Sequence, residues 1–199
     1  MLRNNDNIKN RNMSTLQVHT MDSAPAESKP LLENSVKSFG MIPNLHGVLA
    51  ESPEILEAYQ VLHKLFGQSS FTKEELTVVW QTINVEHECH YCVPAHTAIA
   101  NMMEVDSEIT EALRNKTALP NEKLQVLHDT TLAIVQKRGN ISESEVTTFY
   151  NAGFSERNLL DIILGLSQKV ISNYVNHIAD TPVDEPFQKF EWHSESMTS

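Results

Sequence analysis

Paired helix-start and helix-stop signals recur along this chain of 199 residues. Thr72 with Glu75 has the spacing of a capping box, in which two side chains satisfy free N–H groups of the first helical turn, and Ser142 with Glu145 repeats it. Gly153 follows the second of these segments, as glycine commonly follows a helix. Because glycine-rich hairpin turns are absent from the sequence, the pattern predicts an all-α fold.

The expected helices have apolar residues at helical spacing and cover 31–39, 53–66, 72–86, 124–137, 142–153 and 155–179. Segment 72–86 also contains many β-branched residues, which favour strands. Its capping box and the spacing of Leu76, Val79 and Ile83 favour a helix instead. In the longest segment, 155–179, apolar residues are expected along one side, at Leu159, Ile162, Ile163, Leu166, Val170 and Tyr174.

These helical signals fall within a single predicted domain, residues 29–192. Residues 1–28 are rich in Asn, Ser, Pro and Ala and have no apolar period, so we expect a flexible N-terminal tail there. Residues 193–199 are expected to form a C-terminal tail.

Charge and hydropathy exclude several classes of partner. The formal net charge of −11 argues against nucleic acid, which is bound through basic surfaces. The first residues lack the apolar stretch of a signal peptide, and no segment has the length of a membrane-spanning helix. We therefore expect a cytoplasmic protein with neither a nucleic-acid nor a membrane partner.

The chain has two cysteines, Cys89 and Cys92, three residues apart. A disulfide between them closes almost no loop, so it contributes little to the stability of the fold. The pair therefore indicates redox chemistry or metal binding in a reducing compartment.

A histidine follows the cysteines at helical spacing. Pro94 is tolerated only in the first turn of a helix, so a helix that continues through Met103 should begin near Tyr91 or Cys92. The helix dipole would then lower the pKa of the Cys92 thiol. His96, one turn later, could take the thiol proton directly or through a water molecule.

Cys89 fits the same thiol redox chemistry, and zinc binding is the alternative. Cys89 lies close enough to attack a sulfenic acid on Cys92 and form a disulfide. Alternatively, His90 and His96 could complete a zinc site with the two cysteines. Closed zinc sites usually draw their ligands from two separated segments, which favours the redox interpretation.

The motif Cys89-x-x-Cys92-x-x-x-His96 resembles the signature of the alkylhydroperoxidase D-like (AhpD-like) branch of the carboxymuconolactone decarboxylase family. The similarity extends over about residues 22–192. It includes the segments Phe39-Gly40-Met41-Ile42-Pro43-Asn44-Leu45, Ser52-Pro53 and Asn173-Tyr174-Val175-Asn176-His177.

This resemblance implies an AhpD-like helical bundle, a homo-oligomer such as a trimer or hexamer, and thiol-dependent peroxidase activity. Cys92 would be the peroxidatic cysteine, Cys89 the resolving cysteine, and His96 part of a proton relay. A hydroperoxide would be the substrate, and an external dithiol or a thioredoxin-like protein would reduce the disulfide. We expect no cofactor and no metal ion.

One position departs from the family pattern. Members with this relay usually carry a glutamate about a dozen residues before the first cysteine, where this chain has Thr77. Glu75, Glu86 and Glu88 are the nearby acids that could replace it, and the sequence leaves the choice open.

The sequence therefore favours a thiol-dependent peroxidase, with two alternatives. One is a non-enzymatic redox sensor or interaction protein that responds to its disulfide state. The other is a decarboxylase-type enzyme of the same family, although those members lack the paired cysteines.

Overall fold

The structure, a computed structural model, describes residues 16–194, and within them it contains helices and no strand. A short 3₁₀ helix, Ala26–Ser28, precedes ten α-helices. These are α1 Lys29–Phe39, α2 Asn44–Leu49, α3 Pro53–Gly67, α4 Lys73–Glu86, α5 Cys92–Met102, α6 Ser107–Arg114, α7 Glu122–Lys137, α8 Glu143–Asn151, α9 Glu156–Ala179 and α10 Glu185–Gln188. The predicted all-α class is confirmed. Among these helices, none combines the length and apolar character that crossing a bilayer requires.

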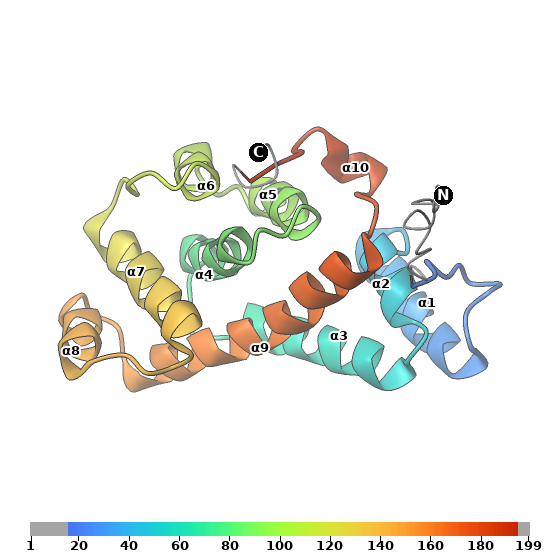
Figure 1. Ribbon diagram of the computed structural model, residues 1–199, viewed down its shortest axis with the longest axis horizontal. Helices are drawn as coiled ribbons and strands as arrows, with labels where there is room; N and C mark the ends of the chain where they lie inside the picture. Colours follow the sequence, from blue (N-terminus) through green and yellow to red (C-terminus); the bar gives the residue numbers. More distant parts are fainter. Residues whose placement is uncertain (1–15, 195–199) are drawn as a thin grey trace, which may run out of the picture.

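Helix α4 lies in the middle of the fold and packs against α5, α6, α7 and α9 (Figure 1). Helix α9 is the longest helix and runs obliquely across the molecule, with α3 packed along it. Helices α7 and α8 lie towards one end of α9, and α1 and α2 lie towards the other.

The burial of α4 explains why its sequence contains so many of the β-branched residues that favour strands. Every residue from 75 to 85 is buried, so apolar and β-branched side chains occupy all sides of this helix. Its predicted capping box is present, with Thr72 accepting from the Glu75 N–H and the Glu75 carboxylate accepting from the Thr72 N–H. A helix buried on all sides does not show the one-sided apolar stripe of a surface helix.

The six helices expected from capping and apolar spacing are present, but three shorter ones were not predicted. Helices α2 and α10 have six and four residues, too few for a periodic pattern. Helix α6 does have a sequence signal, because the Asp106 side chain accepts from the Glu108 N–H at its start.

Residues 16–28, the described part of the segment expected to be a flexible tail, pack against the helical domain. His19 is buried, with 6% of its surface exposed, and its Nε2 lies 2.7 Å from a Glu51 carboxylate oxygen. Its backbone N–H donates to the Gly47 carbonyl at 3.0 Å. A Cβ at Gly47 would lie 2.7 Å from the His19 carbonyl oxygen, so the close approach requires glycine. Hydrogen bonds hold residues 16–28 against the domain, and such bonds leave no apolar period in the sequence. Residues 1–15, the rest of the expected tail, lie outside the described range.

The C-terminal end of the described range is also attached to the domain. The Trp192 indole N–H donates to the Arg114 carbonyl at 3.0 Å, and Ser194 is buried. The predicted C-terminal tail begins at residue 193, and its residues 195–199 lie outside the described range.

Candidate active site

The two cysteines lie at the junction between α4 and α5. Helix α5 begins at Cys92, as Pro94 predicted, so the Cys92 sulfur lies at the positive end of the helix. The Cys92 backbone N–H donates to the Cys89 sulfur at 3.3 Å. Both side chains are free thiols and are buried, with 0% of Cys89 and 2% of Cys92 exposed.

Helix α9 supplies a hydrogen-bond donor to this pair. The Asn176 amide nitrogen lies 3.2 Å from the Cys92 sulfur and 3.9 Å from the Cys89 sulfur. Asn176 is fully buried, and its own amide oxygen has no hydrogen-bond partner in the structure. An amide N–H directed at a sulfur stabilises the thiolate more than the neutral thiol.

A buried lysine from the same helix contacts the predicted catalytic histidine. Lys169 has no exposed surface, and its Nζ lies 2.6 Å from His96 Nε2. An ammonium group only donates, so His96 Nε2 accepts and a neutral His96 carries its proton on Nδ1. His96 Nδ1 is buried without a partner. Among the described residues, no carboxylate forms an ion pair with Lys169.

These surroundings separate the pKa values of the two thiols. Burial alone raises the pKa of Cys92, but hydrogen bonding with Cys89 and the positive charge of Lys169 outweigh it. With further help from the polar side chains of Ser172 and Asn176, the pKa of Cys92 falls to about 5. Burial, together with the neighbouring Cys92, raises the pKa of Cys89 well above its ordinary value. These opposite shifts favour a thiolate at Cys92 and a neutral thiol at Cys89.

His96 stays neutral in this environment. Burial lowers its pKa well below the ordinary value, and the positive charge of Lys169 and the nearby His63 lower it further. Its Nε2 hydrogen bond goes to Lys169, not to Cys92. The structure shows no direct hydrogen bond between His96 and Cys92, which their four-residue spacing suggested; His96 bonds instead to a lysine from another helix.

Aromatic and amide groups fix the orientation of the histidines. The Trp80 indole N–H donates to Gln168 Oε1 at 2.7 Å, which leaves Gln168 Nε2 to donate to His63 Nδ1 at 3.0 Å. The Trp80 ring lies against His96, with 4.8 Å between ring centroids, and stacks on His63 at 5.4 Å. His63 therefore carries its proton on Nε2, and both rings are held by packing.

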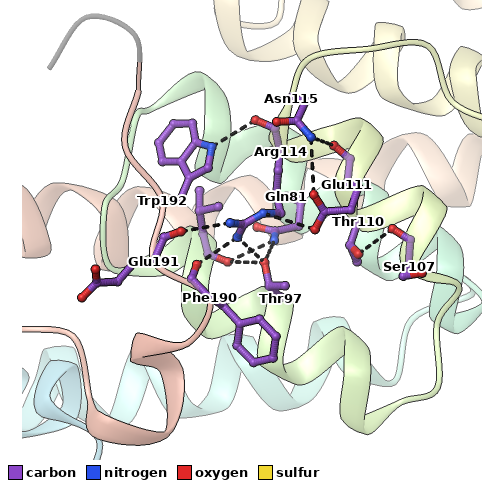
Figure 2. A network of polar contacts seen from close by, with 11 residues as sticks. Gln81, Thr97, Ser107, Thr110, Glu111, Arg114, Asn115, Phe190, Glu191 and Trp192 are labelled. Carbon is purple, nitrogen blue, oxygen red and sulfur yellow. Dashed lines mark hydrogen bonds and ion pairs between the residues drawn. The ribbon is translucent and has the colours of Figure 1, made fainter. Parts of the chain in front are cut away.

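A polar network anchors the face of α5 that carries Thr97 (Figure 2). The Gln81 amide of α4 donates to the Thr97 hydroxyl, which in turn donates to the Val93 carbonyl. Arg114 of α6 donates to Thr97 Oγ1 at 3.1 Å and also to the Phe190 and Glu191 carbonyls. These bonds fix the helix that carries Cys92 and His96, and they attach the C-terminal segment to it.

Glu75 and Glu86, two of the acids considered for the proton relay, contact residues outside the cysteine site. The Glu75 carboxylate caps α4 and pairs with Lys123 at 2.8 Å. Glu86 accepts from the Gln136 amide at 3.1 Å. Glu88 lies in the turn after α4 with a left-handed backbone (φ 51°). Thr77, at the position usual for the glutamate, donates to the Lys73 carbonyl.

The zinc alternative does not have a ligand set in the described part of the chain. His90 Nε2 lies 3.1 Å from the Thr181 carbonyl oxygen and takes part in that contact. Within residues 16–194, no three side chains of His, Cys, Asp or Glu are grouped as metal ligands would be.

The polar face of α9 was not predicted from the sequence. Its members are fully buried and follow helical spacing: Gln168, Lys169, Ser172, Asn173 and Asn176. The apolar side was expected to be the packed one, but Ile163 is 43% exposed and Tyr174 is 53% exposed. The helical spacing of these polar residues was visible in the sequence and could have indicated a second, buried face.

Comparison with known proteins identifies the fold. No family model and no curated protein sequence matches the chain. The AhpD-core, peroxidase-related protein from Ralstonia eutropha JMP134 superposes with a TM-score of 0.77 at 19% identity, covering 87% of this chain and 93% of that one. A peroxidase-related protein from Silicibacter sp. TM1040 gives 0.74 at 22% identity, with the same coverage. The chain therefore has the all-helical AhpD-like fold.

A debrominase shares this fold. The structure of a variant of Bmp8 in complex with 2,3,4-tribromopyrrole superposes with a TM-score of 0.73 at 14% identity, covering 91% of this chain and 97% of that one. Proteins of this fold therefore differ in their chemistry, so the function has to be argued from the site residues.

Proposed function

We propose that this protein is a thiol-dependent peroxidase of the AhpD-like branch, with Cys92 as the peroxidatic cysteine and Cys89 as the resolving one. The observation that carries this proposal is the environment of the Cys92 sulfur. An Asn176 N–H lies at 3.2 Å, a fully buried Lys169 supplies positive charge, and the Cys89 thiol is adjacent. A thiolate next to a neutral thiol is the starting state that disulfide-forming peroxidases need.

The reaction follows from the two protonation states. The Cys92 thiolate attacks the terminal oxygen of the hydroperoxide, so that an S–O bond forms, the O–O bond breaks and an alkoxide leaves. The Cys89 thiol then attacks the Cys92 sulfenic acid, which forms the disulfide and releases water. An external dithiol or a thioredoxin-like protein returns the pair to the reduced state. His96 takes part through Lys169, whose Nζ it orients by accepting a hydrogen bond.

The low exposure of the site supports a small substrate. Both cysteines are buried, with 0% of Cys89 and 2% of Cys92 exposed. Hydrogen peroxide and short-chain alkyl hydroperoxides are the members of the class that need the smallest opening. A reduced cysteine pair also fits a reducing compartment such as the cytoplasm.

A homo-oligomer, a trimer or hexamer, is part of this proposal. The outer face of α9 exposes Leu160, Ile163, Tyr174 and Ile178, with 70% of Leu160 and 65% of Ile178 exposed. Ile163 and Tyr174 also line an apolar groove of about 330 Å³ between α9 and α7. Exposed apolar surface of this kind is typical of protein interfaces.

A dithiol-coupled assay tests the proposed function. The wild type should consume many equivalents of hydrogen peroxide or tert-butyl hydroperoxide while dithiothreitol is present. Cys92→Ser should consume none above background, and Lys123→Met, altered on α7 away from the thiols, should match the wild type. Consumption of one equivalent, with no further turnover, would support the redox-sensor alternative and contradict the proposal.

A further inference from the structure

Lys169 is an isolated buried cation. It is fully buried on α9, and within the described residues no carboxylate pairs with it. Its hydrogen bond goes to His96, which is neutral. A buried ammonium without a compensating negative charge is strongly unfavourable. The compensating group therefore has to come from the remaining titratable side chains around it.

Those side chains come from three segments packed against α9. They are His63 and Tyr59 of α3, Cys89 of the α4–α5 turn, and Cys92 and His96 of α5. Burial lowers the pKa of His63 to about 4 and, as described above, keeps His96 neutral. Burial raises the pKa of Tyr59 and of Cys89, so both keep their protons at neutral pH. Cys92 is left as the anion that balances Lys169.

Oxidation removes this anion. In the disulfide, the Cys92 sulfur carries no charge, while Lys169 stays buried beside the same neutral groups. We propose that Lys169 is the proton store of the cysteine pair, an ammonium when the pair is reduced and a neutral amine when the disulfide has formed. This inference rests on the proposed redox function of the pair, but it applies to any two-electron oxidant.

The proton balance of the peroxidase reaction then closes inside the site. The reactants are the Cys92 thiolate, the Cys89 thiol, the Lys169 ammonium and the hydroperoxide. The products are the disulfide, a neutral Lys169, an alcohol and water. Lys169 releases one proton and the leaving alkoxide takes up one proton, so the reaction requires no net proton from solvent. Lys169 thus provides the proton-handling group that Thr77 cannot provide at the usual glutamate position.

A lysine also serves this site better than a carboxylate in one respect. A carboxylate beside Cys92 would disfavour the thiolate through like-charge repulsion, whereas an ammonium favours it. Lysine can lose its proton when it is buried without a counter-charge, whereas arginine keeps its charge. A lysine at position 169 therefore combines two roles, stabilising the thiolate and releasing a proton after oxidation.

The pH dependence of exchange with dithiothreitol tests this inference. The purified protein is oxidised with diamide, equilibrated with mixtures of reduced and oxidised dithiothreitol, and quenched by alkylation so that the reduced fraction can be counted. Between about pH 6 and 8, below the range where dithiothreitol thiols ionise, oxidation of dithiothreitol releases two protons. The exchange constant is the equilibrium constant for reduction of the protein disulfide by dithiothreitol. If reduction of the protein also takes up two protons, one of them onto Lys169, this constant is independent of pH.

A different pH dependence is expected if Lys169 does not change its protonation state. If Lys169 keeps its charge in both redox states, reduction takes up one proton, and the constant rises tenfold per pH unit. A wild-type constant that changes less than about threefold over these two units supports the proposal, and a rise approaching a hundredfold overturns it. Lys169→Arg keeps a permanent charge, so in that variant, if it folds, the constant should rise tenfold per pH unit.

This experiment is independent of the proposed peroxidase activity. Diamide forms the disulfide and no hydroperoxide is present, so a protein without turnover still gives a full result. Conversely, a peroxidase whose exchange constant rises tenfold per pH unit would keep the proposed function and lose only the role of Lys169. Two neutral thiols would also give a pH-independent constant, so the thiolate absorbance of the reduced wild type is recorded over the same pH range. Absence of this absorbance would overturn the proposal, and neither measurement needs the arginine variant to fold.

Discussion

Replacing Lys169 with methionine should raise the pKa of Cys92. The substitution keeps a long apolar stem in the buried space and removes the positive charge, so burial of the thiol is no longer offset by it. An opposite charge at close range shifts a pKa by about 1–3 units, and full burial of both groups places the effect in the upper part of that range. From about 5 in the wild type, the pKa of Cys92 should reach about 7 to 8.

The thiolate population makes this shift measurable. At pH 6 the wild type should have about 90% of Cys92 as thiolate, and Lys169→Met about 1–10%. Ultraviolet absorbance of the thiolate, recorded as a function of pH with Cys92→Ser as the blank, reports this fraction without requiring a reagent to enter the site. Lys169→Arg should titrate near the wild-type value, because the charge is retained.

Two controls make the result specific. Circular dichroism checks that Lys169→Met keeps its helices, and Lys123→Met removes a lysine whose contact is with Glu75. If Lys169→Met titrates with the same midpoint as the wild type, Lys169 does not stabilise the thiolate and the electrostatic account of the site is refuted.

Four further outcomes follow from the same geometry. In Cys89→Ser the oxidised protein should stop at a sulfenic acid on Cys92, which dimedone labels and mass spectrometry detects; an unlabelled variant would mean that Cys89 is not the resolving thiol. His96→Ala should slow peroxide turnover by about a hundredfold while keeping the wild-type circular dichroism spectrum; turnover at the wild-type rate would remove His96 from the mechanism. The pKa of Cys92 is lower in the folded protein (about 5) than in an unfolded chain (about 8.5), so the thiolate's stabilisation is complete above the unfolded value and is lost as pH falls through the folded one. Denaturant unfolding of the reduced protein should therefore show this loss between about pH 8.5 and about pH 5, and Cys92→Ser should lack it; equal slopes would contradict the lowered pKa. Light scattering should give a multiple of the 22.5 kDa chain mass, and Ile178→Glu on the outer face of α9 should lower it; a wild-type monomer at micromolar concentration would exclude the oligomer.

Local signals in the sequence were sufficient for much of the fold. Pro94 placed the start of α5 correctly, because proline is excluded from later turns of a helix. The capping boxes at Thr72 and Ser142 are both present, since they depend on residues three positions apart. Signals of this range also brought Cys89 and Cys92 together in one site.

The partners of those cysteines could not be predicted in the same way. Lys169 and Asn176 reach the site from α9, more than seventy residues further along the chain. Which face of α9 is buried depends on its neighbours, and the apolar side, including Tyr174, proved to be partly exposed. The acids close to the cysteines in the sequence therefore do not include the group that bonds to His96, which is Lys169 of α9.

Dithiol-dependent turnover of hydroperoxide by the wild-type protein is the most direct test of the central claim. With dithiothreitol in excess, peroxide consumption should continue through many equivalents per chain, should stop in Cys92→Ser, and should leave a Cys89–Cys92 disulfide when the dithiol is omitted. Peroxide consumption that ends after one equivalent, or that continues unchanged in Cys92→Ser, would contradict the assignment of this site as a thiol peroxidase.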